Sequence, residues 1–208
     1  MTFFGGSFVA DALVSNGKTV GVLALQGGVA EHAAVLERLG ARVVLVKKPE
    51  HLVGLDALVL PGGESSTIDR LTRIFGLREP LIDTVESGLP TLGTCAGLIM
   101  LAREIDDSAP GQQSLGVLDV SVGRNAFGSQ VDSAEAVLDW QAVAGEITPV
   151  KTVFIRAPRI SRVGGNVVIT AKYRGEVVGV RQGNIIGISF HPELTGDTRV
   201  HEELLALV

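Results

Sequence analysis

Cys95 is the only cysteine among the 208 residues of this chain, and its neighbours suit a nucleophile. It lies in Gly93-Thr94-Cys95-Ala96-Gly97, between an apolar run that predicts a strand and a second run, 98–102, that predicts a helix. A thiol on such a turn lies at a helix N-terminus, where free amides and the helix dipole favour the nucleophilic thiolate. Free cysteines are more often small buried hydrophobic residues. The two flanking glycines favour a strained turn instead, the cysteine counterpart of a serine nucleophile elbow.

His191 and Glu193 are candidates for the two groups that a cysteine nucleophile requires. An imidazole can take the thiol proton and return it to a leaving group, and a carboxylate can orient that imidazole. In an extended chain, residues two positions apart point to the same side, so we expect Glu193 to reach Nδ1 of His191. The alternative is a histidine at a strand end with a purely structural carboxylate. The presence of Cys95 in the same chain favours the catalytic interpretation.

The segment Pro61-Gly62-Gly63-Glu64 is a candidate for stabilising an oxyanion. Two adjacent glycines permit a positive φ, which can turn a backbone N–H into a pocket. An ordinary glycine-rich turn is the alternative. Glu64 could accept a hydrogen bond from a substrate ammonium group, and Arg124 and Arg156 could hold a carboxylate through the bidentate geometry that arginine favours. Isolated arginines are usually solvated, so these roles depend on the rest of the site.

The elements that must position these residues follow a β-α-β pattern. Continuous apolar runs predict strands covered on both faces, and helical spacing predicts a helix that ends at Gly40. Ser66, with Asp69 three residues later, predicts the N-cap of a further helix. Shorter runs beyond Asp106 predict hairpins and an antiparallel extension. The predicted strands are 19–25, 42–46, 57–60, 89–93, 116–122, 152–155, 167–170, 177–180 and 184–190, and the predicted helices are 29–39, 66 onward and 200–208.

We therefore expect an α/β fold with three layers: an open, mostly parallel sheet, helices on both of its faces, and an antiparallel extension. The carboxyl ends of parallel strands converge on one crevice, where Cys95 and His191 would meet. The first residues lack Lys or Arg before Lys18 and are interrupted by Asp11, which argues against a signal peptide. We expect residues 1–17 to form an appended arm and 18–208 to form one domain.

Composition excludes several functional classes. A net charge of -5 without a basic cluster argues against a nucleic-acid partner. No apolar run is long enough to cross a bilayer, so we expect no membrane partner. A lone, reactive cysteine is most easily kept reduced in the cytosol, which predicts a cytoplasmic protein. The four histidines are scattered in the sequence, and we expect no metal site.

Six short segments combine these candidate residues with specific neighbours. They are Leu23-Ala24-Leu25-Gln26-Gly27 with Glu31-His32, Pro61-Gly62-Gly63-Glu64-Ser65, Gly93-Thr94-Cys95-Ala96-Gly97, Arg124-Asn125-Ala126-Phe127-Gly128, Phe154-Ile155-Arg156-Ala157-Pro158 and His191-Pro192-Glu193.

Together, these segments resemble the glutaminase subunits of bacterial pyridoxal 5'-phosphate synthases, a family of class I (triad) glutamine amidotransferases with a flavodoxin-like fold. The cysteine turn and His-Pro-Glu occur throughout that class, whereas the two segments containing Arg124 and Arg156 point to the vitamin B6 branch. The resemblance extends from about Val20 to the C-terminus. Gly28, where the family often has an acidic residue, and Ser66, which replaces a frequent threonine, depart from the pattern without touching the triad.

The resemblance implies hydrolysis of L-glutamine to L-glutamate and ammonia through a glutamyl thioester. Cys95 would be the nucleophile, His191 the general acid and base, and Glu193 the orienting carboxylate. No cofactor is implied. The ammonia would pass to a synthase subunit, a barrel protein, within a large hetero-oligomer. The resemblance also implies oxyanion donors at Gly63 and Ala96, with a peptide flip at Gly63 when the synthase docks, and glutamine contacts at Gly63, Glu64, Ser65, Arg124, Ile155 and Arg156.

Three other functions fit parts of the sequence. A glutaminase serving another synthase, such as those for imidazole glycerol phosphate or GMP, would share the triad but is not expected to carry the Arg124 and Arg156 segments in this form. A cysteine hydrolase or peptidase of related fold would act without a partner. A non-enzymatic binding module is disfavoured because Cys95, His191 and Glu193 are all present.

Overall fold

The computed structural model describes residues 17–124 and 133–208. Residues 1–16 of the expected arm and Asn125 to Gly128 of the arginine-containing segment lie outside the described residues. None of the helices in the described ranges is both long enough and apolar enough to cross a membrane.

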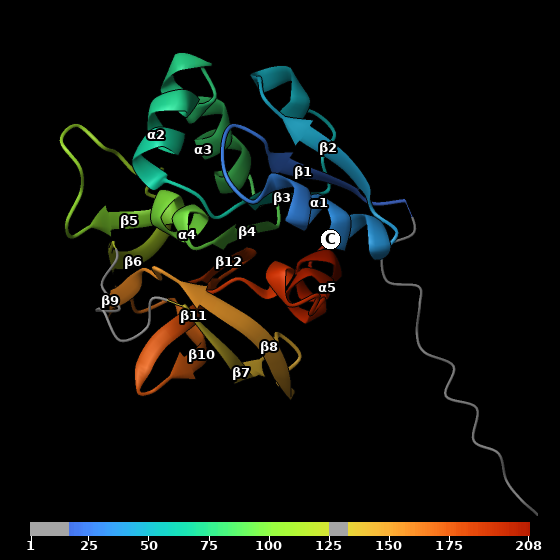
Figure 1. The fold of residues 1–208 in the computed structure, drawn as a ribbon. Helices are drawn as coiled ribbons and strands as arrows, with labels where there is room; N and C mark the ends of the chain where they lie inside the picture. The colour runs from blue at the N-terminus through green and yellow to red at the C-terminus, as the bar shows by residue number, and fades with distance from the viewer. Residues whose placement is uncertain (1–16, 125–132) are drawn as a thin grey trace, which may run out of the picture.

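A seven-stranded sheet forms the centre of the fold, in the order β10-β11-β12-β4-β3-β1-β2 (Figure 1). Five neighbouring strands in it run parallel, and β11 and β10 extend it antiparallel. This arrangement confirms the predicted mostly parallel sheet with an antiparallel extension. The strands are β1 (Thr19–Leu23), β2 (Arg42–Val46), β3 (Ala57–Leu60), β4 (Thr91–Thr94), β10 (Val168–Tyr173), β11 (Glu176–Gln182) and β12 (Ile185–Ile188).

Two smaller sheets flank the central one. The first pairs three strands in the order β5-β6-β9, and the second is the antiparallel hairpin β7-β8. Their bounds are β5 (Ala102–Ile105), β6 (Leu118–Gly123), β7 (Ser133–Gln141), β8 (Ile147–Ile155) and β9 (Arg159–Val163).

Helices cover both faces of the central sheet, as expected. Their bounds are α1 (Val29–Arg38), α2 (Ser65–Ile74), α3 (Arg78–Glu86), α4 (Ala96–Leu101) and α5 (Arg199–Ala206), with 3-10 turns η1 (Pro49–Leu52) and η2 (Pro192–Leu194). The predicted N-cap of α2 at Ser66 is wrong. The helix begins at Ser65, so the cap position falls two residues earlier, at Glu64, whose carboxylate accepts the Ser66 N–H at 3.1 Å. Asp69 pairs instead with Arg73, at 2.8 Å.

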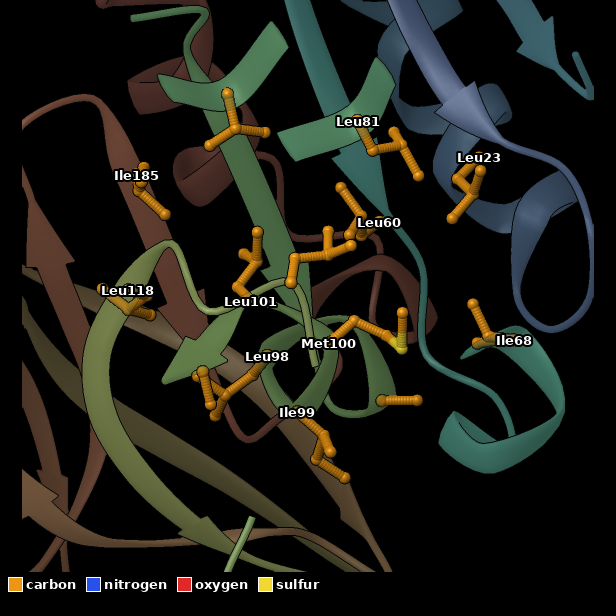
Figure 2. Close-up of a cluster of buried hydrophobic side chains, with 14 of the residues drawn as sticks. Leu23, Leu60, Ile68, Leu81, Leu98, Ile99, Met100, Leu101, Leu118 and Ile185 are labelled. Carbon is orange, nitrogen blue, oxygen red and sulfur yellow. The ribbon is translucent and has the colours of Figure 1, made fainter. Parts of the chain in front are cut away.

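The central strands divide the core into two apolar clusters, because alternate side chains point to opposite faces. On β3, Leu58 and Leu60 join the cluster under α2, α3 and α4, whereas Ala57 and Val59 join the cluster under α1, α5 and the β7-β8 hairpin. Figure 2 shows the first cluster around α4, where Leu98 and Leu101 point into the packed interior. Every residue of α4 is buried. The short helix that follows Cys95 is therefore held by packing rather than by its own length.

Candidate active site

Three neighbouring parallel strands bring the predicted site residues together. Ile188 of β12 pairs with Thr94 of β4, and Leu60 of β3 pairs with Gly93 of β4, so the three strands end at one edge. Cys95 directly follows β4, the Gly62-Gly63 turn follows β3, and His191 follows β12 by three residues. Residues far apart in the sequence therefore meet at the crevice where parallel strands end.

Cys95 occupies a strained turn between β4 and α4. Its backbone has φ 51° and ψ -104°, which L-residues rarely adopt, and its amide donates to the Ile188 carbonyl at 2.8 Å. Strain of this kind costs about 1–3 kcal/mol and concentrates at functional sites. The residue is 8% exposed. The flanking glycines serve packing rather than the turn itself: a Cβ at Gly97 would collide with the Leu60 carbonyl, so glycine allows α4 to lie against β3.

His191 and Glu193 form a buried hydrogen bond of 2.7 Å between Nδ1 and Oε1. The expected contact is present, but the extended-chain reason for it is wrong. The chain turns into η2 immediately after His191, and that 3-10 turn carries the carboxylate back to the ring. The His191 amide also donates to the Val153 carbonyl at 2.9 Å, which anchors the turn to β8.

The environment of His191 strongly favours its protonated form. Burial of the ring opposes the positive charge, but hydrogen bonds and charge interactions with Cys95 and Glu193 outweigh that cost and raise the pKa of His191 to about 10. Because Nδ1 is engaged by Glu193, Nε2 is the nitrogen left to face Cys95. The geometry thus places an imidazolium between a thiol group and a carboxylate, which is the order that a proton-transferring triad requires.

A small cleft opens beside Cys95, and all six residues expected to bind substrate line it. Sequence reasoning missed Ile99, which lies one helical turn after Cys95 on α4 and whose spacing could have identified it. Two larger hollows lie along the β7-β8 hairpin and contain none of the predicted residues. The residues lining the cleft are Gly63, Glu64, Ser65, Cys95, Ile99, Arg124, Ile155 and Arg156.

The cleft combines one carboxylate with two guanidinium groups. Arg124 lies 3.8 Å from Glu64 through Nη2 and donates through Nη1 to Gln112 Oε1 at 2.8 Å. Partial burial opposes the charge on Glu64, but hydrogen bonds from Ser66 and the charges of Arg124 and Arg156 lower its pKa below the usual value. Arg156 has a positive φ of 43°, a second strained residue in the cleft. This charge set complements an amino acid zwitterion.

The Gly62-Gly63 turn is held close to both the triad and the loop that follows β1. Neither glycine has the positive φ that the sequence suggested. Their lack of a side chain matters for space instead: a Cβ at Gly62 would collide with the His191 ring, and one at Gly63 would collide with Gln26. Ala96, the other expected oxyanion donor, is the first residue of α4, and such a residue has no intrahelical acceptor for its amide.

The most important group that sequence reasoning missed is a buried pair of histidines behind the triad. Nδ1 of His32 lies 2.9 Å from Nε2 of His201, and Nε2 of His32 lies 3.5 Å from Oε1 of Glu193. The two histidines come from α1 and α5 and are 169 positions apart. Three of the four histidines therefore converge, although the sequence suggested that they were scattered. Among the described residues, no three His, Cys, Asp or Glu side chains form a group able to hold a metal ion.

A family model and curated relatives match this chain over nearly its whole length. Residues 22–207 match the model of the SNO glutamine amidotransferase family. The pyridoxal 5'-phosphate synthase subunit PdxT of Kineococcus radiotolerans is 51% identical over 201 residues, which cover 94% of this chain and 97% of that protein. The subunit of the same name from Cutibacterium acnes is 53% identical over 196 residues, covering 91% and 96%.

Solved structures share the fold. A crystal structure of a glutamine amidotransferase is 48% identical, with a TM-score of 0.84, and covers 90% of this chain and 97% of its own. The structure of PurLQS from Thermotoga maritima has a TM-score of 0.66 at 17% identity, with coverage of 93% and 97%, and shows similarity of fold alone.

These matches confirm the resemblance inferred from the six sequence segments, together with the fold class that it implied. They also confirm the enzyme class, a glutaminase that acts on a carboxamide. The match runs from β1 to α5 and therefore includes every residue of the cleft and all three candidate triad residues. The chain belongs to the SNO glutamine amidotransferase family.

Proposed function

We propose that this chain hydrolyses the side-chain amide of L-glutamine through a triad of Cys95, His191 and Glu193. The observation that carries this proposal is the continuous series of contacts from the Cys95 thiol to His191 and on to the buried Glu193 carboxylate, 2.7 Å from the ring. A cysteine nucleophile, a base and an orienting carboxylate in that order are what acyl transfer requires.

The charges in the cleft support glutamine as the acyl donor. The Glu64 carboxylate suits the α-ammonium group, and the Arg124 and Arg156 guanidinium groups suit the α-carboxylate. Gly63, Ser65 and Ile155 complete the contacts around the substrate. When these residues hold the α-ammonium and α-carboxylate groups of glutamine, its side-chain amide extends toward Cys95.

The proposed reaction has two halves. The Cys95 thiolate attacks the amide carbon, and the amides of Gly63 and Ala96 stabilise the oxyanion. His191 then gives its proton to the leaving nitrogen, ammonia departs, and a glutamyl thioester remains. In the second half His191 takes a proton from water, the hydroxide attacks the thioester, and glutamate leaves as the thiolate re-forms. The chemistry uses only side chains and backbone amides of this chain.

We further propose that the ammonia passes to the synthase subunit of a pyridoxal 5'-phosphate synthase within a large hetero-oligomer. The support comes from relatives about half identical over nearly their whole length, which bear the name of a pyridoxal 5'-phosphate synthase subunit. Residues 18–208 would act as one glutaminase domain. The lone Cys95 thiol favours a reducing, cytoplasmic setting.

The test is a glutamine-dependent synthesis of pyridoxal 5'-phosphate. The full chain is mixed with a synthase subunit and with pentose and triose phosphates, and amide-labelled ¹⁵N-glutamine is supplied. We expect label in the pyridine ring with the native chain and none with Cys95→Ala. Free ammonium should restore synthesis with the Cys95→Ala variant, because only the ammonia source is lost. Glutamine hydrolysis by Cys95→Ala at the native rate would refute the triad. Hydrolysis without transfer of label would refute the proposed partner alone.

A further inference from the structure

His32 and His201 are fully buried polar side chains that the proposed reaction does not use. His32 lies on α1, and its Nε2 is 3.0 Å from Thr94 Oγ1 and 3.5 Å from Glu193 Oε1. Its Nδ1 is 2.9 Å from Nε2 of His201 on α5. The series His201, His32, Glu193, His191 therefore leads from the interior of the protein to the catalytic thiol of Cys95.

Both rings are neutral in this environment. Burial, followed by the nearby His201 and His191, holds the pKa of His32 well below its usual value. Burial and Arg38 lower the pKa of His201 to about 4, although Asp197 opposes this shift. A neutral imidazole carries one N–H, so the direction of the hydrogen bonds along the series is decided by which nitrogen holds the proton.

The surroundings select one arrangement of protons. If His32 carried its proton on Nδ1, its Nε2 lone pair would face the Glu193 carboxylate at 3.5 Å. His201 would then have to hold its proton on Nδ1, a buried atom with no hydrogen-bond partner among the described residues. A buried N–H without an acceptor is rare and costly. In the opposite arrangement, His201 donates from Nε2 to Nδ1 of His32, and Nε2–H of His32 donates to Thr94 Oγ1 at 3.0 Å, with Glu193 Oε1 3.5 Å away.

We infer that His32 is a positioning residue of the glutaminase: its neutral Nε2–H, which donates to Thr94 and lies 3.5 Å from Glu193 Oε1, keeps that carboxylate in place for His191. His201 in turn sets the tautomer of His32. His32 has this role only if Glu193 belongs to the catalytic triad, as proposed above. A neutral donor suits the position because it attracts the carboxylate without neutralising the charge that His191 needs.

His191 and His32 both contact the same carboxylate oxygen, Oε1 of Glu193. It accepts from His191 at 2.7 Å and faces His32 at 3.5 Å, whereas the buried Oε2 has no hydrogen-bond partner among the described residues. Without His32, His191 would be the only group in the described part of the chain that forms a hydrogen bond or ion pair with the Glu193 carboxylate. The carboxylate could then rotate, and the ring that it orients would move with it.

A purely structural role for His32, joining α1, α5 and β4, is the competing explanation. His32→Leu removes both hydrogen bonds, whereas His32→Gln places an amide N–H near the position of Nε2. The matched control is Glu203→Leu, which breaks another buried polar contact of α5, the one with the Trp140 indole N–H, away from the triad. Glutaminase kinetics are measured on each full chain with the synthase subunit present, alongside chemical unfolding of the chain alone.

We expect His32→Leu to lower kcat about tenfold or more with little change in KM, because the cleft that binds glutamine is untouched. His32→Gln should recover kcat to within about threefold of the native chain, and Glu203→Leu should lose stability while keeping native kcat. If His32→Leu keeps native kcat, or if kcat follows unfolding stability across all three variants, the positioning role is refuted.

A second readout does not depend on glutamine. Cys95 is the one cysteine in the chain for iodoacetamide to alkylate, and the alkylation rate at neutral pH reports how reactive that thiol is beside His191. We expect slower alkylation in His32→Leu and recovery in His32→Gln. A native chain that alkylates rapidly but never hydrolyses glutamine would refute the proposed function. Equal alkylation rates in the native chain and both His32 variants would refute the positioning role alone.

Discussion

Oε1 of Glu193 lies 2.7 Å from Nδ1 of His191, although the two residues are separated only by Pro192. The 3-10 turn η2 makes this short return possible, and the Glu193 side chain is only 1% exposed. Because the carboxylate is held away from water, solvent screens its interaction with the imidazole ring only weakly. One turn of chain thus fixes the tautomer of the proposed catalytic base and, together with Cys95, favours its positive charge.

Replacing Cys95 should separate catalysis from stability. Cys95→Ala and Cys95→Gly both lack the thiol, so we expect neither to hydrolyse glutamine. The backbone at φ 51° and ψ -104° is strained for any L side chain, and only glycine relieves it. After allowing for the greater freedom of unfolded glycine, we expect Cys95→Gly to be about 1 kcal/mol more stable than Cys95→Ala. Urea denaturation measures the difference, and equal midpoints would contradict the assigned strain.

Removing the charge of Arg124 should weaken glutamine binding more than the chemical steps. A charge-assisted hydrogen bond is worth about 1.5–3 kcal/mol, so we expect Arg124→Gln to raise KM roughly tenfold to a hundredfold, with a smaller change in kcat. The matched control is Arg103→Gln, since Arg103 is 59% exposed and pairs with Asp119 outside the cleft. A native KM in Arg124→Gln would exclude Arg124 from the substrate site.

A methyl group at Gly62 should disturb the triad from the side. It would collide with the His191 ring and move it relative to Cys95. Misplacement of a catalytic group by about 1 Å can cost about a hundredfold in rate, so we expect Gly62→Ala to lower kcat by that order. Gly165→Ala is the control. Gly165 has no positive φ, and an added Cβ there would meet no atom within 4 Å. Similar kinetics in the two variants would be inconsistent with the assigned packing.

The buried histidines should make the fold sensitive to acid. His32 and His201 have lowered pKa values when folded, that of His201 being about 4, so the unfolded chain binds more protons below its ordinary pKa of 6.5. The contribution of His201 to stability is therefore complete above about pH 6.5 and is lost as the pH falls through about 4, and that of His32 is lost in the same direction as the pH falls below 6.5.

His201→Gln tests this dependence. A glutamine does not titrate, so we expect the free energy of unfolding of the variant to fall less steeply with acid than that of the native chain. The difference between the two slopes should be about 1.4 kcal/mol per pH unit between roughly pH 6.5 and 4. Above pH 7 the two stability curves should run parallel, which provides the internal control. Urea titrations at half-unit pH steps measure both slopes. Identical slopes below pH 6.5 would show that His201 is not held neutral in the folded protein.

Short sequence patterns were sufficient to predict the central sheet and the candidate nucleophile, base and carboxylate. The central strand β3 is buried on both faces and appears in the sequence as a continuous apolar run at 57–60, whereas the edge strand β2 is apolar at 43–46 although Leu45 is exposed. Cys95, His191 and Glu193 lie next to strand ends and within short motifs, so their types and spacing were informative without coordinates. All six expected substrate contacts line one cleft for the same reason.

The errors arose where the local chain geometry was ambiguous. Ser66 and Glu64 are both able to cap a helix, and the choice depends on where α2 begins against the sheet. The His191–Glu193 contact was expected for an extended chain and instead arises from a 3-10 turn. Residue 62 must be glycine because the His191 ring lies against it, and no local sequence pattern predicts that contact.

The amino-acid sequence by itself therefore determined the fold class, the enzyme class and the candidate nucleophile, base and carboxylate, because each depends on residues close together in the chain. Only the tertiary structure decided that His32 and His201 stand behind Glu193. Their contact joins positions 169 apart through the packing of α1 and α5 on one face of the sheet. Sequence periodicity shows that a helix has a buried face, but which buried side chains meet across two helices depends on how the whole chain packs.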